Sequence, residues 1–561
     1  MFDFYDTKST KCFFGKKTAV FLLSAGCIFG YDADGIDSAK PPVEPQTKAQ
    51  ELTIIQNEEK FALDGGGKIY IKDFEIEGTL EGESLEEITA SYKNKELGMR
   101  GINELNAKII QYYKSRGYPM ANALVPKQNI QNDILKIIVI IGRYGAVSYV
   151  NESPVRDFVI QNTLERTLKK GGYITSSLLE RAMLLTGDMS GAALPKVTIT
   201  AGEEFGTSDF DFEFDAVERF GGYITGDNYG SRLTGKQRLS IAFDVNSPFG
   251  LGDKVSFGGV QSKGADLQDG RVSYIFPVFS NGIKGEISAE KTDYELGQEY
   301  KDLEAVGTAK VLSFALSYPV IRTQFENLYA KAGYAKKEMK DNIKVLGNTI
   351  PKEIDVTSFS LSYERYTTLF GLNTFYTVGT NMNFGSLKIT DEKEKELNKK
   401  GINTLGSYAK ADISLLGSIA LSDVLTLSGN LKIQKALNNK NLDGSEQISL
   451  SGTSGVGAYP DSEYSADNGY VIGAELSYKL PEFVGITHNA GVFFDIGRGI
   501  AEENSPASAK NRMLADIGLS YHIRYKGFFA KLQAAKVVGS EEVLSEDDYE
   551  TRYLCQIGAI F

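Results

Sequence analysis

Two kinds of hydrophobic pattern follow one another along the chain, and the change falls near residue 216. Before that point, short alternating runs are interleaved with stretches in which apolar residues recur every three or four positions, as on one face of a helix. One such helical stripe consists of Ile102, Leu105, Ile109 and Tyr112. After residue 216 helical periodicity almost disappears, and alternation with a period of two replaces it. The pattern therefore predicts an α+β region followed by a long all-β region.

The α+β region repeats one order of elements. In the first half, residues 68–78 alternate like a strand, a helix follows, and strands are predicted at 120–125 and 134–141. The second half has the following predicted elements: a strand at 146–150, helices at 155–169 and 176–186, and strands at 195–201 and 208–214. The repetition indicates two small α+β domains in tandem, over residues 68–143 and 144–215.

The region 216–561 is predicted to form a membrane barrel. Its strands alternate as in Leu239 to Val245, where apolar residues face one way while Ser240, Ala242 and Asp244 face the other. An open soluble sheet could alternate too, but small and polar residues line the second face in strand after strand, which suits a water-filled lumen. At roughly 20–22 residues per strand with its connections, the region holds about 16 strands. The predicted fold is α+β domains followed by a transmembrane antiparallel β-barrel.

Both ends of the chain carry further signals. Lys16 and Lys17 precede a short apolar run, which predicts a cleaved signal peptide over residues 1–33, with a signal anchor as the alternative. Residues 34–67 are predicted to be a linker in which 47–62 form either a short, charge-rich helix able to plug a pore or an unstructured spacer. The alternating C-terminal segment ends on Phe561 and resembles the strand by which outer-membrane barrels are recognised for insertion.

Composition and the spacing of particular residues argue against several classes of function. Asp and Glu outnumber Lys and Arg by 73 to 61, and a net charge of −12 argues against a nucleic-acid partner. No apolar run of helix-spanning length follows the N-terminus. The cysteines at positions 12, 27 and 555 give neither a disulfide framework nor a zinc-site spacing.

No catalytic constellation is recognisable. The histidines are His488 and His522, and neither has a nucleophile or carboxylate at motif spacing. Residues 230–236 match a phosphate-binding loop, but Gln237 replaces the magnesium-binding hydroxyl residue and enters a strand rather than a helix. We therefore predict no enzyme activity, no cofactor and no metal.

The first small domain resembles a known module. The runs Tyr113-Lys-Ser-Arg-Gly-Tyr118, Val125-Pro-Lys-Gln128 and Ile141-Gly-Arg143 are similar, in order and spacing, to the first polypeptide-transport-associated (POTRA) domain of two-partner secretion transporters, the TpsB family of haemolysin secretion and activation proteins. The corresponding motif positions are Gly117, Tyr118, Pro126, Gln128, Gly142 and Arg143. The second domain is similar to the family's second POTRA domain through residues 179–185 and 206–209.

The barrel carries a second resemblance to the family. The region 451–470 looks like the sixth extracellular loop, which in the family folds back into the lumen. Its expected tip is Gly455, Val456, Gly457, Ala458, Tyr459 and Pro460. The strand motif that receives this tip looks like Phe493-Phe-Asp-Ile-Gly497, with Phe493, Asp495 and Gly497 as its motif residues.

One position departs from the family pattern. The family's loop arginine pairs with the motif aspartate, but here Gly457 stands where the arginine belongs. Removing one partner of a buried ion pair leaves the other charge uncompensated. Either Asp495 pairs with another cation or hydroxyl, or the loop is held loosely. The simpler interpretation is that Asp495 is an ordinary solvated carboxylate in the lumen. Arg498 is close in sequence but should point to the opposite side of its strand.

The resemblance implies an outer-membrane pore with its POTRA domains in the periplasm. Its expected partners are a secreted, haemolysin- or adhesin-like exoprotein with an N-terminal secretion domain, the outer-membrane lipid, and the barrel-assembly machinery that inserts it. Two alternatives remain at this stage. A barrel-assembly insertase would be expected to carry more POTRA domains, and a passive porin or receptor would need only the barrel.

Overall fold

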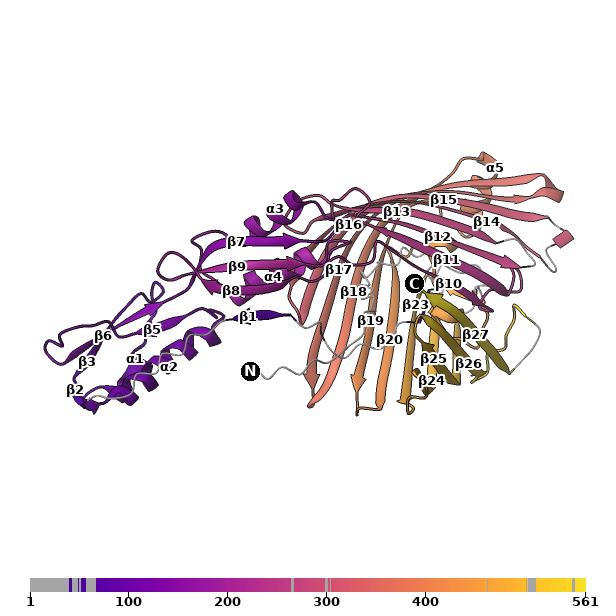
Figure 1. Ribbon diagram of the computed structural model, residues 1–561. Coiled ribbons are helices and arrows are strands. Elements are labelled where there is room, and N and C mark those ends of the chain that lie inside the picture. Colours follow the sequence, from indigo (N-terminus) through magenta and orange to yellow (C-terminus); the bar gives the residue numbers. More distant parts are fainter. Residues whose placement is uncertain are drawn as a thin grey trace.

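A computed structural model describes residues 40–42, 49, 52–56, 67–263, 267–297, 301–302, 304–461, 463–500, 502, 511–546 and 550–561. The molecule is elongated, with an arm of two small domains at one end and a large barrel at the other (Figure 1). The predicted signal peptide over residues 1–33 lies outside the described residues. Among the residues described, no helix is both long enough and apolar enough to cross a bilayer.

The first domain packs one long helix on a small sheet. Its elements are β2 (Ile69–Ile71), β3 (Asp73–Glu77), α1 (Glu86–Thr89), β4 (Lys95–Leu97), α2 (Met99–Ser115), β5 (Asn122–Leu124) and β6 (Ile134–Ile140). The strands pair in the order β3-β6-β5, and β2 pairs separately with β4. The face of α2 that reaches the core ends in Tyr113, which is fully buried, whereas the predicted Tyr112 is half-buried.

The second domain has two helices on a mixed sheet. Its elements are β7 (Arg143–Asn151), α3 (Asp157–Thr167), α4 (Ser176–Gly187), β8 (Lys196–Ala201) and β9 (Thr207–Phe214). Phe210, Phe212 and Phe214 alternate into the core against both helices. The strands and helices therefore lie close to where the sequence pattern predicts them.

The linker contains a strand where a helix was considered. Residues Ile54–Gln56 form β1, which pairs in parallel with β8 at the edge of the second domain's sheet. The helical interpretation is wrong for these residues, because β8 offers unsatisfied edge groups and the two isoleucines favour an extended chain. The rest of the segment 47–62 lies mostly outside the described residues.

Sixteen described strands close into one antiparallel barrel, which confirms the predicted fold and strand number. They are β10 (Phe220–Asp227), β11 (Gln237–Asn246), β12 (Lys254–Lys263), β13 (Gln268–Pro277), β14 (Lys284–Glu295), β15 (Ala305–Arg322), β16 (Glu326–Ile343), β17 (Asn348–Leu369), β18 (Leu372–Ile389), β19 (Gly406–Ala420), β20 (Leu425–Leu437), β23 (Asn468–Lys479), β24 (Ile486–Ile500), β25 (Arg512–Tyr525), β26 (Phe528–Val537) and β27 (Thr551–Ile560). The C-terminal strand β27 pairs with β10, with Tyr223 opposite Ile560.

The alternation along each strand separates lipid from lumen. On β11, Leu239 and Ile241 are exposed on the outside, while Arg238 and Ser240 are buried on the inside. Since closure pairs every strand on both sides, no barrel edge is left to bind another chain. The lumen is polar, as a barrel that encloses water or protein requires.

The arm is joined to the barrel by buried polar contacts. The guanidinium of Arg322, at the end of β15, donates to both carboxylate oxygens of Asp188 at 2.7 and 2.8 Å. The backbone amide of Arg156 donates to the carbonyl of Gly250 in the turn between β11 and β12. The turns on this side of the barrel therefore lie at the end that carries the arm, and the longer connections lie at the other end.

Candidate functional site

The connection between β20 and β23, residues 438–467, folds back into the barrel, and we call it loop L6. It carries a short hairpin of β21 (Ile448–Ser449) and β22 (Ser465–Ala466). Leu450, Val456 and Tyr459 are fully buried and belong to one cluster with the wall residues listed here: Val471, Phe493, Leu514 and Ala535. Burial of loop side chains against inward-facing strand residues places L6 in the lumen.

The tip of L6 is held by hydrogen bonds from three directions. The backbone amide of Ala458 donates to Oδ2 of Asp516 on β25 at 2.6 Å. Arg552 on β27 donates from Nη1 to the carbonyl of Tyr459 at 2.7 Å. Burial raises the pKa of Tyr459 to about 12, so its hydroxyl keeps the proton that it donates to the carbonyl of Glu541 at 2.7 Å. The tip is thus fixed although it lacks an arginine side chain.

Backbone amides take the place of that side chain. The amides of both Gly457 and Ala458 face the carboxylate of Asp516. A Cβ on Gly457 would lie 3.6 Å from Oδ2 of Asp516, an ordinary contact distance, so a larger residue at this position would point at the same carboxylate. Amide donors stabilise a buried carboxylate in the same way as a cation, though more weakly for each bond.

The predicted strand motif lies beside the loop, but its aspartate contacts a second carboxyl group instead of the backbone of the loop tip. Phe493 packs in the L6 cluster. A Cβ on Gly497 would lie 3.2 Å from the carbonyl oxygen of Leu450 and 3.3 Å from Val456, so glycine permits the close approach of L6 to β24. Asp495 is directly opposite Asp516 in the strand register, and the two carboxyl groups contact each other. Asp516, not Asp495, accepts the bond from Ala458.

The remaining tip residues shape the turn. Gly455 lies against the chain of L6 itself, since a Cβ there would be 2.4 Å from the carbonyl oxygen of Leu450. Pro460 is buried beside Tyr459. Arg498 points away from the lumen and is exposed, as the strand alternation requires.

A second anchor of L6 lies near the opposite wall. The carboxylate of Glu446 bonds Lys337 on β16 at 2.7 Å and Lys410 on β19 at 3.3 Å, and all three side chains are buried. Burial alone would raise the pKa of Glu446, but the two lysines outweigh it and hold this pKa below its usual value. Because β16 and β25 are nearly opposite in the closed strand order, L6 bridges the lumen.

A third anchor joins L6 to the loop between β26 and β27, which we call L8. The buried carboxylate of Glu463 accepts from Arg512 on β25 at 2.9 Å and from the amides of Leu544 and Ser545 in L8. Asp461 faces the Arg238–Asp227 pair at 3.9 Å from Arg238. The sequence motifs do not predict these anchors. The sequence signal that points to them is a charged residue at a strand position whose side chain faces the lumen.

The described part of the linker also reaches the lumen. Gln556, which faces inward on β27, donates from Nε2 to the carbonyl of Lys40 at 3.2 Å. Residues 54–56, in contrast, lie on the arm as β1. The linker therefore connects the inside of the barrel to the second POTRA-like domain.

Four of the six motif residues in the arm form the joint between its two domains. Gly117, with a φ of +89°, accepts from the amide of Ser176 at 2.9 Å. Gly142 accepts from the amide of Ile174. The ring of Tyr118 packs edge-on against Tyr173, and Arg143 covers the same ring at 4.1 Å while bonding the carbonyl of Gly171.

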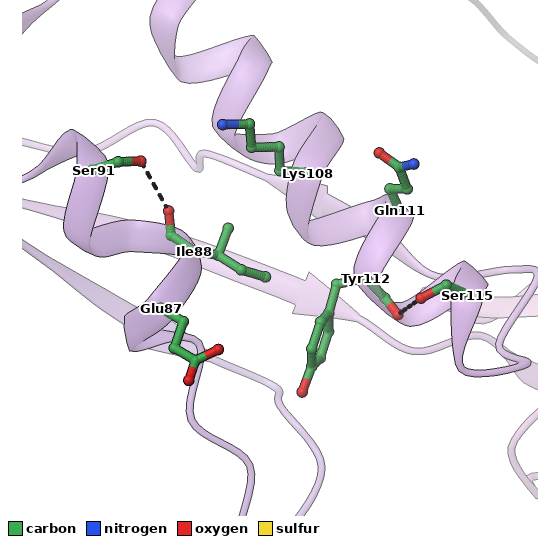
Figure 2. A pocket seen from close by; sticks show the side chains of 7 residues that line it. All are labelled: Glu87, Ile88, Ser91, Lys108, Gln111, Tyr112 and Ser115. Carbon is green, nitrogen blue, oxygen red and sulfur yellow. Dashed lines mark hydrogen bonds between the residues drawn. The ribbon is translucent and has the colours of Figure 1, made fainter.

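The other two arm residues lie within the first domain. The side chain of Gln128 exchanges two hydrogen bonds with the backbone of Lys136, at 2.8 and 2.9 Å, and also donates to the carbonyl of Pro126. The groove between α1 and α2 contains none of the motif residues (Figure 2). Its serine hydroxyls, on Ser91 and Ser115, donate to carbonyls of their own helical segments.

Comparison with known proteins shows which family has this arrangement. The sequence model of the haemolysin secretion/activation proteins ShlB/FhaC/HecB matches residues 206–521, more than half of the chain. A ShlB-type POTRA domain model matches residues 69–142. The chain belongs to the ShlB/FhaC/HecB family. It is therefore a two-partner secretion transporter of the outer membrane, and neither an enzyme, an insertase nor a passive porin.

Two known transporters are similar in sequence over most of the chain, and one solved structure is similar in fold. The heme/hemopexin transporter protein HuxB of Haemophilus influenzae strain 86-028NP is 25% identical over 474 residues, covering 84% of this chain and 81% of HuxB. The outer membrane transporter CdiB of Dickeya dadantii is 22% identical over 520 residues, covering 84% of this chain and 87% of CdiB. The structure of CdiB from Escherichia coli superposes with a TM-score of 0.72 at 17% identity, covering 90% and 93% of the two chains.

Proposed function

We propose that this ShlB/FhaC/HecB-family transporter captures an unfolded exoprotein by adding a strand to the β8 edge of its second POTRA domain and then conducts it through the lumen. The expected partner is a haemolysin- or adhesin-like protein with an N-terminal secretion domain. The outer-membrane lipid surrounds the barrel, and the barrel-assembly machinery inserts it.

One observation carries the capture step. The chain's own segment Ile54–Gln56 is already added to the β8 edge as a parallel strand, with Ile54 opposite Val197. Main-chain hydrogen bonds supply the affinity of such pairing, so the edge accepts an extended segment with little demand on its sequence. The exoprotein would displace the linker strand, and the linker also contacts the lumen wall at Gln556. Capture would thereby be coupled to the state of the pore.

Loop L6 supports the conduction step. It bridges the lumen through anchors at Glu446, Asp516 and Glu463, so it must move or loosen before a chain can pass. Since the family exports exoproteins, a pore closed at rest keeps the outer membrane sealed between transport events.

A disulfide between the linker and the edge tests the capture step. Ile55 is opposite Thr198 in the register, so the I55C/T198C pair, in a C555S background, should form a disulfide on oxidation. We expect the oxidised full-length protein to lose binding of an exoprotein's N-terminal secretion fragment and the reduced protein to regain it, with each single-cysteine variant as control. Equal binding in both redox states would rule out the β8 edge as the capture site.

A further inference from the structure

A basic cavity lies where the second POTRA domain meets the barrel. It has a volume of about 460 Å³ and is lined by α3, α4, the segment between them, the turn after β13, and β15. Its charged lining residues are Arg166, Lys169 and Arg181. None of the described lining residues is acidic, so the cavity has a positive electrostatic potential with no counter-charge in its wall.

The nearby carboxylates are already engaged elsewhere. Asp188 is bound by Arg322 through both carboxylate oxygens. Glu180 accepts from the backbone amide of Gln324. Within the described part of the chain, Arg166 and Lys169 form no ion pair. The cavity therefore suits an anion supplied from outside the protein.

The other side of the cavity is apolar and faces the membrane. The side chain of Tyr318 lies on the outer face of β15, as do those of the exposed residues Leu312, Phe314 and Leu316. Leu178 and Tyr173, on the POTRA side, are more than one-third exposed. A single ligand that fills the cavity would thus contact cations at one end and aromatic or aliphatic groups at the other.

The turns beside the cavity show where it lies along the barrel axis. Asn281, in the turn between β13 and β14, lines the cavity, and the same turn exposes Phe279. The next periplasmic turn exposes Phe325. Aromatic residues at strand ends mark the boundary between hydrocarbon and headgroups in outer-membrane barrels. The cavity therefore lies at headgroup level in the periplasmic leaflet.

We propose that this cavity binds the phosphate-bearing headgroup of an anionic phospholipid of the periplasmic leaflet. Arg166 and Lys169 contact the phosphate, and the acyl chains run along Tyr318 and the lipid face of β15. A free phosphate ion would use only the basic half of the site. Because the lining residues come from both the POTRA domain and the barrel, a bound lipid ties the arm to the membrane surface.

The test compares two charge-reversed variants of the full-length protein in nanodiscs of phosphatidylcholine and phosphatidylglycerol. R166E/K169E changes the cavity, and K68E/K127E makes the same charge change at exposed lysines of the first POTRA domain. Native mass spectrometry after detergent transfer counts the phosphatidylglycerol that remains bound. Each lost cation near a membrane surface weakens anionic lipid binding roughly fivefold. The affinity of R166E/K169E for phosphatidylglycerol should therefore be lower than that of the wild type by more than about 25-fold.

Wild type and K68E/K127E should retain phosphatidylglycerol equally and in preference to phosphatidylcholine. R166A/K169A provides the same comparison if charge reversal prevents folding, as judged by heat-modifiable gel mobility. Equal retention by the cavity variants, no preference over phosphatidylcholine, or displacement of the lipid by an equal concentration of inorganic phosphate would each overturn the proposal.

Discussion

At the residue scale, the decisive feature is how the tip of L6 is held without an arginine. The sequence motifs predict a loop tip and a strand motif beside it, and they mark Gly457 as the departure from the family pattern. They could not identify the acceptor, because Asp495 and Asp516 become neighbours only through the register of β24 and β25. Nor can a sequence motif show backbone donors, since every residue except proline has an amide.

We expect D516A to loosen the loop tip and D495A to leave it in place. A hydrogen bond to a charged group contributes about 1.5–3 kcal/mol, so D516A should raise the exposed population of L6 by roughly tenfold or more. D495A removes the carboxyl group that contacts Asp516 but keeps the acceptor of the Ala458 amide, so it should change the exposed population of L6 far less than D516A does. The measurement is the labelling rate of S454C, in a C555S background, by a membrane-impermeant maleimide on whole cells. Faster labelling in D495A than in D516A would contradict the assignment.

A second residue-scale prediction concerns Glu446. E446Q leaves Lys337 and Lys410 buried without their counter-charge, and breaking a buried ion pair costs about 3–5 kcal/mol. The pore of E446Q should open more often than that of the wild type in planar-bilayer recordings. E392Q, which alters an exposed ion pair on α5 (Glu392–Lys400), is the matched control. Identical opening frequencies in E446Q and E392Q would show that this anchor does not hold the loop.

At the element scale, most helices and strands followed from hydrophobic periodicity. The segment β1 did not, since its pairing partner β8 is more than 140 residues away and local charge favoured a helix. A three-residue strand has too little pattern of its own to be recognised. Its hydrogen bonds come from the sheet edge, so only tertiary structure decides its conformation.

The joint between the POTRA domains provides an element-scale prediction. Arg143 joins the start of β7 to Gly171 by a hydrogen bond and to Tyr173 by a cation–π contact. R143A should broaden the distribution of distances between spin labels placed on α2 and α4, because both contacts are lost. R100A, at an almost fully exposed position on α2, should leave the distribution unchanged. A distribution in R143A as narrow as that of the wild type would rule out this role.

At the scale of the whole molecule, the transporter is a closed barrel with an internal loop and a periplasmic arm. Strand number and closure were predictable because alternation and length are properties of the sequence alone. The anchors of L6 were not, since Lys337 and Glu446 are 109 residues apart and meet only across the lumen. The same holds for Tyr459 and Arg552, which are 93 residues apart.

The central claim is that the exoprotein passes through the lumen only when L6 leaves its resting position. The most direct test is export by a G457C/L554C variant in a C555S background, because a Cβ at position 457 would lie 3.8 Å from Cδ1 of Leu554. Cross-linking the two cysteines, by oxidation or with a short bifunctional thiol reagent, should stop release of the exoprotein, and reduction of the disulfide should restore it. Undiminished export with L6 cross-linked to β27 would contradict the claim.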